Sequence, residues 1–66
     1  MLITVNGAPR EMAEGASGAQ LLAELAIPAA TAVAEVNGRI LLSSQFQAQA
    51  LCEGDEIELV TIVGGG

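Results

Sequence analysis

The chain has 66 residues, enough for one domain at most, which excludes a two-domain enzyme. Apolar residues make up 52% of it, sufficient for one small core. The formal net charge is −6, Arg10 and Arg39 are the only basic residues, and Phe46 is the only aromatic one. Nucleic-acid binding is not expected, because it usually needs a basic patch with arginine or aromatic readers.

Cys52 is the only cysteine, so neither an internal disulfide nor a multi-thiolate metal site can form within one chain. With no His or Lys to activate its thiol, we expect it to be inert and partly buried. No apolar run approaches the ~20 residues of a membrane-spanning helix, and no signal-peptide pattern opens the chain. The sequence predicts a cytoplasmic protein without a membrane partner.

A β-hairpin is predicted at the start of the chain. Residues 1–5 are strand-like and lead into Asn6-Gly7, the dipeptide best suited to a tight hairpin because both residues tolerate positive φ. Residues 8–12 form the expected return strand. Pro9 fits there only near the strand's start or on a sheet edge.

One amphipathic helix of about two to three turns is predicted next. Ser17 and Gln20 have the spacing of a capping box, which satisfies backbone N–H groups at a helix start. Pro28 prevents the helix from continuing. Its apolar side consists of Leu21, Leu22 and Leu25.

The second half of the chain predicts another hairpin and a final strand. Residues 31–36 and 39–42 flank a second Asn-Gly pair, Asn37-Gly38. Residues 43–46 are expected to form a turn or short helical bend that tucks Phe46 inward, and Leu51 is expected in the core. After a turn at Gly54-Asp55, residues 56–63 are the most β-prone run.

This order of hairpin, helix, hairpin, loop and strand predicts an α+β fold. One helix would cross one face of a mixed sheet of about four to five strands, with the last strand beside the first. That is the β-grasp arrangement. We expect it to span residues 1–63, followed by a flexible glycine tail at residues 64–66.

Alternation along the last strand predicts a docking surface, because successive side chains point to opposite faces. Ile57 and Leu59 share one face, whereas Glu58 marks the other as solvent-facing. The apolar residues on that wet face suggest partner contact rather than packing within the domain or scattered surface apolar groups, which are the alternative. The expected docking residues are Val60, Ile62 and, by the same alternation, Val33.

The chain has no His, Lys, Tyr or Trp, so it lacks most general bases and amine nucleophiles, and we expect no enzymatic activity of its own. Four carboxylates gather near the end of the chain. They could bind a hard cation or act as an acid/base pair, but they do not match a calcium loop. We therefore expect no bound metal. We expect instead a solvated acidic surface that attracts basic partners, formed by Glu53, Asp55, Glu56 and Glu58.

The last strand runs directly into Gly64-Gly65-Gly66. Three extended residues reach about 10 Å, and glycine backbone can thread a channel too narrow for other residues. The α-carboxylate of Gly66 is an anion at neutral pH and could attack the α-phosphate of ATP to form an acyl-adenylate. The alternative interpretation is a frayed end or a cloning remnant.

Taken together, these segments resemble the ubiquitin-like sulfur carrier family, and most closely its thiamine-biosynthesis branch, ThiS. The resemblance covers essentially the whole chain, with Phe46 where members often have Trp and Leu42-Ser43 where they often have Pro-Arg. It rests on residues 3–7 (Ile-Thr-Val-Asn-Gly), 21–25 (Leu-Leu-Ala-Glu-Leu), 36–38 (Val-Asn-Gly), 54–60 (Gly-Asp-Glu-Ile-Glu-Leu-Val) and 63–66 (Val-Gly-Gly-Gly).

The resemblance implies that Gly66 is adenylated by a ubiquitin-activating-type enzyme (ThiF-like) using ATP. The glycyl adenylate would then become a thiocarboxylate, 1-thioglycine, with Gly64 and Gly65 threading the partner's active site. The sulfur would come from a cysteine desulfurase or rhodanese-like protein and pass to thiazole synthase (ThiG-like). No cofactor would be bound.

Three alternatives remain open at this point. The first is a molybdopterin-synthase small subunit, which also ends in Gly-Gly on this fold. The second is a non-reactive β-grasp docking module, and the third is a conjugated protein modifier.

Overall fold

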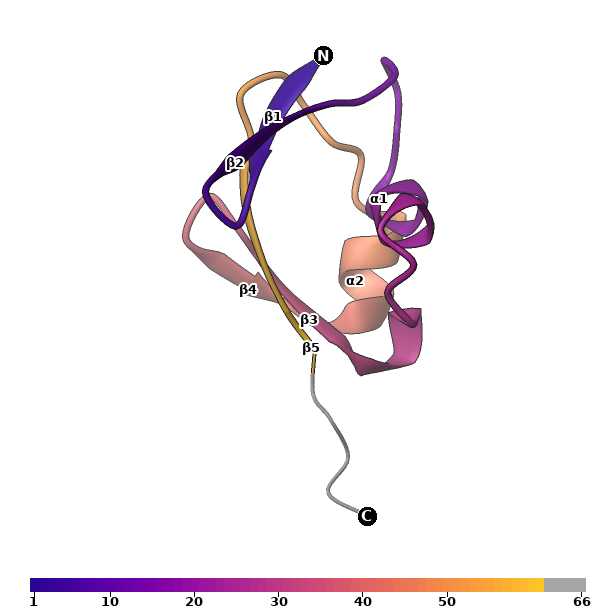
Figure 1. The fold of residues 1–66 in the computed structure, drawn as a ribbon. Coiled ribbons are helices and arrows are strands. Elements are labelled where there is room, and N and C mark those ends of the chain that lie inside the picture. The colour runs from indigo at the N-terminus through magenta and orange to yellow at the C-terminus, as the bar shows by residue number, and fades with distance from the viewer. Residues whose placement is uncertain (62–66) are drawn as a thin grey trace.

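Residues 1–61, which this computed structural model describes, form a five-stranded mixed sheet with two helices on one of its faces (Figure 1). The strands are β1 (Leu2–Val5), β2 (Ala8–Glu11), β3 (Ala32–Val36), β4 (Arg39–Leu41) and β5 (Glu56–Thr61). Their order across the sheet is β2-β1-β5-β3-β4, so the last strand in sequence lies at the centre. β5 runs parallel to β1 and antiparallel to β3. The predicted β-grasp arrangement, with the last strand beside the first, is confirmed.

The first hairpin forms where it was predicted. Asn6 and Gly7 both have positive φ, at 49° and 82°, as a tight two-residue hairpin turn requires. β2 forms one edge of the sheet, so Pro9 removes no ladder hydrogen bond from an interior strand. The return strand ends at Glu11, one residue earlier than predicted, and Met12 turns into the core.

Helix α1 (Gly18–Glu24) begins at the predicted capping box. The Ser17 hydroxyl accepts from the Gln20 N–H at 3.3 Å, and the Gln20 side-chain oxygen accepts from the Ser17 N–H at 2.8 Å. Leu21 and Leu22 are fully buried against the sheet. Neither helix in residues 1–61 has the length and apolar character needed to cross a bilayer.

The second hairpin joins β3 and β4 through Asn37-Gly38, again with positive φ at both residues. Its first strand starts one residue later than predicted. Thr31 belongs to a short 3-10 turn (Ala29–Thr31), because its hydroxyl and N–H both donate to the Pro28 carbonyl. Leu42, predicted to end the return strand, instead precedes the second helix.

The bend predicted at residues 43–46 is a helix, α2 (Ser43–Ala48). Gln45 begins it by accepting the Leu42 N–H at 2.9 Å. Phe46 is fully buried, as predicted, and Leu51 is buried in the core, also as predicted. α2 contacts both α1 and β3, and its Phe46 ring joins the core beside Leu21 and Leu22.

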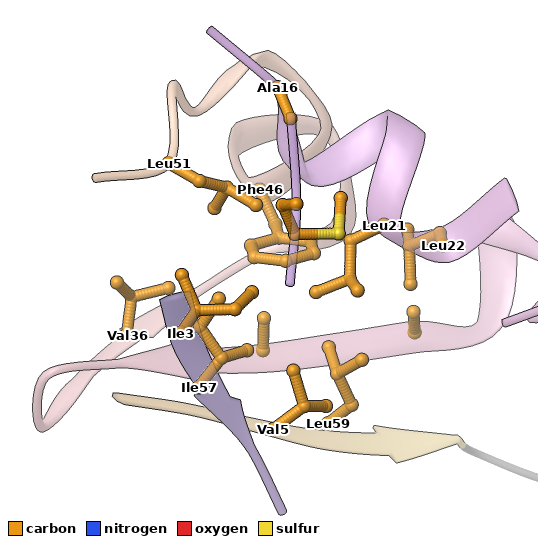
Figure 2. Close-up of a cluster of buried hydrophobic side chains, with 13 residues drawn as sticks. Ile3, Val5, Ala16, Leu21, Leu22, Val36, Phe46, Leu51, Ile57 and Leu59 are labelled. Atoms are coloured by element: carbon orange, nitrogen blue, oxygen red, sulfur yellow. The ribbon is translucent and has the colours of Figure 1, made fainter. Parts of the chain in front are cut away.

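The core is the layer between the two helices and the inner face of the sheet (Figure 2). β1, β3 and β5 contribute alternate residues from below, and the helices and their flanking loops close the layer from above. Burial of these aliphatic side chains and of the Phe46 ring stabilises the fold by about 25 cal/mol per Å² of apolar area removed from water. The core residues labelled in Figure 2 are Ile3, Val5, Ala16, Leu21, Leu22, Val36, Phe46, Leu51, Ile57 and Leu59.

Gly18 has a packing role that its place at a helix start did not reveal. A Cβ added there would lie 1.9 Å from the Phe46 carbonyl oxygen, far inside van der Waals contact. The close approach lets the Gly18 N–H donate to the Gln49 carbonyl at 2.9 Å. Glycine at this position therefore sets the separation between α1 and α2.

We predict that Gly18→Ala lowers the free energy of unfolding by about 3 kcal/mol, because the added methyl forces the two helices apart. Gly15 is the matched control. Its φ is +80° but nothing lies within 4 Å of an added Cβ, so Gly15→Ala costs only the backbone strain of about 1–2 kcal/mol. Urea unfolding of both variants measures the difference. A Gly18→Ala variant that loses no more stability than Gly15→Ala would contradict the close helix contact, because Gly18 has no positive φ to strain.

Candidate functional site

The candidate site is the end of β5 together with the sheet face that carries no helix. β5 is hydrogen-bonded on both of its edges. On the β1 side, the Asn6 N–H donates to the Ile57 carbonyl at 2.8 Å. On the β3 side, pairing continues to Thr61, which lies opposite Ala32. The strand that leads to the terminal glycines is therefore anchored in the middle of the sheet.

Four residues with sequence-assigned roles lie outside the described part of the chain. They are Ile62, expected to dock, Gly64 and Gly65, expected to thread a partner's active site, and Gly66, expected to react. The predicted division between the domain and a tail at residues 64–66 lies there too. β5 is the described element from which the chain continues toward them.

The predicted alternation along β5 is confirmed. Ile57 and Leu59 are 1% and 8% exposed and face the helices, whereas Val60 is 61% exposed on the opposite face. Val33 lies directly across from Val60 in the β3–β5 ladder and is half-buried. Because side chains opposite each other in a ladder are about 5 Å apart, these two valines form one apolar surface.

Ile40 extends this outer face and was not among the predicted docking residues. It is 71% exposed and pairs with Glu35, which points away from the helices. The signal was present in the sequence. A two-residue turn at Asn37-Gly38 pairs residue 36 with 39 and residue 35 with 40, which puts Ile40 on the same face as Glu35.

On the strands, the arginines and the glutamates lie on opposite faces of the sheet. Arg10 and Arg39 lie opposite Ile3 and Val36, whose side chains point toward the helices. Arg10 also pairs with Glu24 of α1 at 3.0 Å. The glutamates of the strands alternate the other way and point to the outer face. The charged strand residues on that face are therefore all acidic: Glu11, Glu35, Glu56 and Glu58.

Two of these glutamates oppose each other directly. Glu35 and Glu58 are partners in the β3–β5 ladder, and both are exposed. Like charges in directly opposite positions destabilise a sheet. The pair lies next to the Val33–Val60 pair in the same ladder, so apolar and anionic groups meet at the centre of the outer face.

The four predicted steering carboxylates are not equivalent. Glu56 and Glu58 are exposed on the outer face, and Glu53 is exposed while accepting the Leu2 N–H at 3.1 Å. The expectation of a solvated Asp55 is wrong, because that residue is only 9% exposed.

Asp55 performs a structural role instead. Its carboxylate oxygens accept from the Asn37 side-chain amide at 3.0 Å and from the Cys52 N–H at 2.8 Å. These bonds close the turn before β5 and tie it to the second hairpin.

Cys52 is exposed rather than partly buried as expected. Its neighbours explain the difference, because its N–H is held by Asp55 at the surface turn and Leu51 takes the adjacent core position. Within residues 1–61, no three His, Cys, Asp or Glu side chains come together in a way that could hold a metal ion.

The comparisons with known proteins agree with this geometry. The sequence profile of the ThiS family matches residues 3–66. The crystal structure of the thiamine biosynthesis protein ThiS from Geobacter metallireducens shares 35% sequence identity, with a TM-score of 0.79 and full coverage of both chains. A solution structure of a thiamine biosynthesis protein from the same organism, also 35% identical, gives a TM-score of 0.77 over all of this chain and 88% of that one. The search of curated proteins found no significant match.

The parallel β1–β5 pair at the centre, the helices on one face and the last strand leading to a glycine end define a ubiquitin-like β-grasp protein. Within that class, the chain belongs to the ThiS family. ThiS proteins are small sulfur carriers in thiamine biosynthesis.

We predict that Asp55→Ala lowers the free energy of unfolding by about 2 kcal/mol, because it leaves the Asn37 amide and the Cys52 N–H, whose bonds to Asp55 are part-buried, without their acceptor. Glu58→Gln is the matched control, since it also removes one negative charge from this region. That variant should keep or slightly raise stability by relieving the repulsion from Glu35. Urea unfolding distinguishes the two, and equal losses would contradict the structural role of Asp55.

Proposed function

We propose that the chain carries sulfur as a thiocarboxylate on Gly66 and donates it for thiazole formation in thiamine biosynthesis. The observation that carries this proposal is the ThiS family match over residues 3–66, which includes all three terminal glycines. The central, doubly anchored β5 supports it, because a rigid strand presents the arm that follows it in a defined direction. The family match also favours thiamine biosynthesis over the molybdopterin-synthase alternative.

The first step is adenylation by a ubiquitin-activating-type enzyme, ThiF-like, in the cytoplasm. A carboxylate oxygen of Gly66 attacks the α-phosphorus of ATP, the bond from that phosphorus to the bridging oxygen breaks, and pyrophosphate leaves. The product is a glycyl adenylate, a mixed anhydride whose AMP is a good leaving group. The chain is the substrate in this step, and the partner enzyme supplies the catalytic groups.

The second step installs sulfur. The terminal sulfur of a persulfide, on a cysteine desulfurase or rhodanese-like protein, attacks the Gly66 carbonyl carbon and AMP leaves. A thiol then reduces the resulting S–S bond, forming a disulfide with the donor cysteine and freeing the thiocarboxylate. That sulfur passes to thiazole synthase, ThiG-like, as the nucleophile that enters the thiazole ring.

The described residues contribute recognition. The Val33–Val60 pair provides an apolar contact that a partner can cover, and we assign Ile62 to the same contact from its place in the sequence. Glu53, Glu56 and Glu58 attract a basic groove and raise the rate of encounter. Gly64 and Gly65 supply backbone without side chains, so that the arm can enter a narrow active site.

We predict that Val60→Asp weakens binding to the activating enzyme at least tenfold, because it places a charge in the centre of the apolar contact. Its stability should stay within about 1 kcal/mol of wild type, as for most exposed sites. Ala23→Asp is the control, since it adds the same charge on the exposed side of α1. Calorimetric titration measures both, and equal binding of the two variants would contradict docking through the outer face.

We predict that the full chain supports ATP–pyrophosphate exchange by the activating enzyme, whereas a chain lacking Gly66 does not. Removing one terminal glycine withdraws the carboxylate from the reacting position without altering residues 1–61. The truncated chain should still bind the enzyme through the outer face and inhibit the full chain. Exchange that is unaffected by the truncation would contradict Gly66 as the reacting residue, and no exchange with either chain would favour the non-reactive docking module.

A further inference from the structure

The backbone ladder between β1 and β5 is short. Only Thr4 with Glu56 and Val5 with Ile57 are paired. Beyond Val5 the chain enters the first hairpin turn. The Asn6 N–H still donates to the Ile57 carbonyl of β5 at 2.8 Å, and the backbone then turns away at the left-handed φ of 49°. On the β3 side, by contrast, pairing of β5 continues to Thr61.

The side chain of Asn6 continues the ladder that its backbone leaves. Its Oδ1 accepts the Leu59 N–H at 2.7 Å, and its Nδ2 donates to the Leu59 carbonyl at 3.4 Å. A side-chain amide offers the same donor and acceptor as a peptide group. The Asn6 side chain therefore takes the place of one further backbone partner for β5, at Leu59, two residues beyond Ile57.

The second hairpin turn gives a matched comparison within the same molecule. Asn37 has φ 51°, and its side chain also bonds to the region of β5, accepting the Glu56 N–H at 2.9 Å and donating to Asp55. Both turn asparagines thus hold the central strand. Asn37 bonds to Glu56 at the start of β5. Asn6 bonds to Leu59, nearer the end of β5 that leads to the terminal glycines.

We propose that Asn6 is a positioning residue that fixes the direction in which β5 delivers the C-terminal arm to a partner. Without its bonds to Leu59, the last described residues of β5 would be held on the β3 edge alone. The turn itself does not require the amide, because glycine or aspartate also accepts this conformation. The inference rests on the proposed function, because it concerns how the reactive arm is presented.

The test uses Asn6→Gly, which keeps the turn and removes both side-chain bonds, and Asn37→Gly, which makes the same change at the start of β5. Affinity for the activating enzyme is measured by calorimetry for each variant, both as the full chain and as a chain ending at Val63. Amide hydrogen exchange of Leu59 is measured alongside.

We expect Asn6→Gly to weaken binding of the full chain about tenfold, which is the effect expected from the loss of about one hydrogen bond. The same change should leave the affinity of the chain ending at Val63 unaltered, since there is no arm to present. Exchange at Leu59 should accelerate. Asn37→Gly should lower stability yet leave the affinity of the full chain unaltered at a temperature where it remains folded.

Asn6→Asp separates the hydrogen bond from a general effect on folding. It retains the acceptor for the Leu59 N–H but loses the donor to the Leu59 carbonyl, so exchange at Leu59 and affinity should lie between those of Asn6→Gly and wild type. Values no better than those of Asn6→Gly would overturn the assignment. Equal losses from Asn6→Gly with and without the glycines would do the same, because the effect would then act through the sheet face.

Failure of the positioning role can be distinguished from failure of the carrier role. If removal of the glycines weakens wild-type binding while Asn6→Gly changes nothing, the positioning role alone is wrong. If wild-type affinity does not depend on the glycines, the positioning role is overturned, whereas the carrier role fails only if the full chain supports no ATP–pyrophosphate exchange.

Discussion

The central place of β5 is the constraint on which the other features of this protein depend. The strand is bonded to β1 on one edge and to β3 on the other, and the asparagines of the two hairpin turns add side-chain bonds near its two ends. Its inner residues, Ile57 and Leu59, join the core beneath the helices. Its outer residues form the middle of the open face, and its end leads to the terminal glycines. One strand therefore links the core, the open face and the segment that continues to the terminal glycines.

The chain has few reactive side-chain types, and its charged and apolar surface residues are divided between the two faces of the sheet. It has no His or Lys, and both of its arginines lie on the strand parity that faces the helices. The outer face is left with glutamates and exposed apolar side chains, including the unfavourable Glu35–Glu58 opposition. Like charges directly opposite each other destabilise a sheet, so a cation placed over this pair would relieve the repulsion.

Local patterns in the sequence predicted most of the fold. The two Asn-Gly turns, the Ser17–Gln20 capping box and the alternation around Glu58 each depend on a few neighbouring residues, so they could be interpreted without tertiary contacts. The same alternation correctly placed Val60 and Val33 outward.

The missed features depend on residues that are distant in sequence. Asp55 is buried because Asn37 reaches it from another hairpin, and Gly18 is required because the backbone of Phe46 passes against it. Asn6 was interpreted only as a turn residue, since nothing near it in the sequence indicates that its amide would bond to Leu59. Residues 43–46 were predicted only as a turn or short helical bend. The helix that forms at Ser43–Ala48 is too short to have much intrinsic stability and depends on its contacts with α1 and β3.

The intact mass of the protein purified from its native host tests most directly whether Gly66 carries sulfur. The proposed function predicts a fraction heavier than the unmodified chain by the difference between one sulfur and one oxygen atom, located in the C-terminal peptide. That fraction should disappear when the activating enzyme is deleted from the host. Only the unmodified mass, from cells actively making thiamine and with alkylation used to trap any thiocarboxylate, would contradict it.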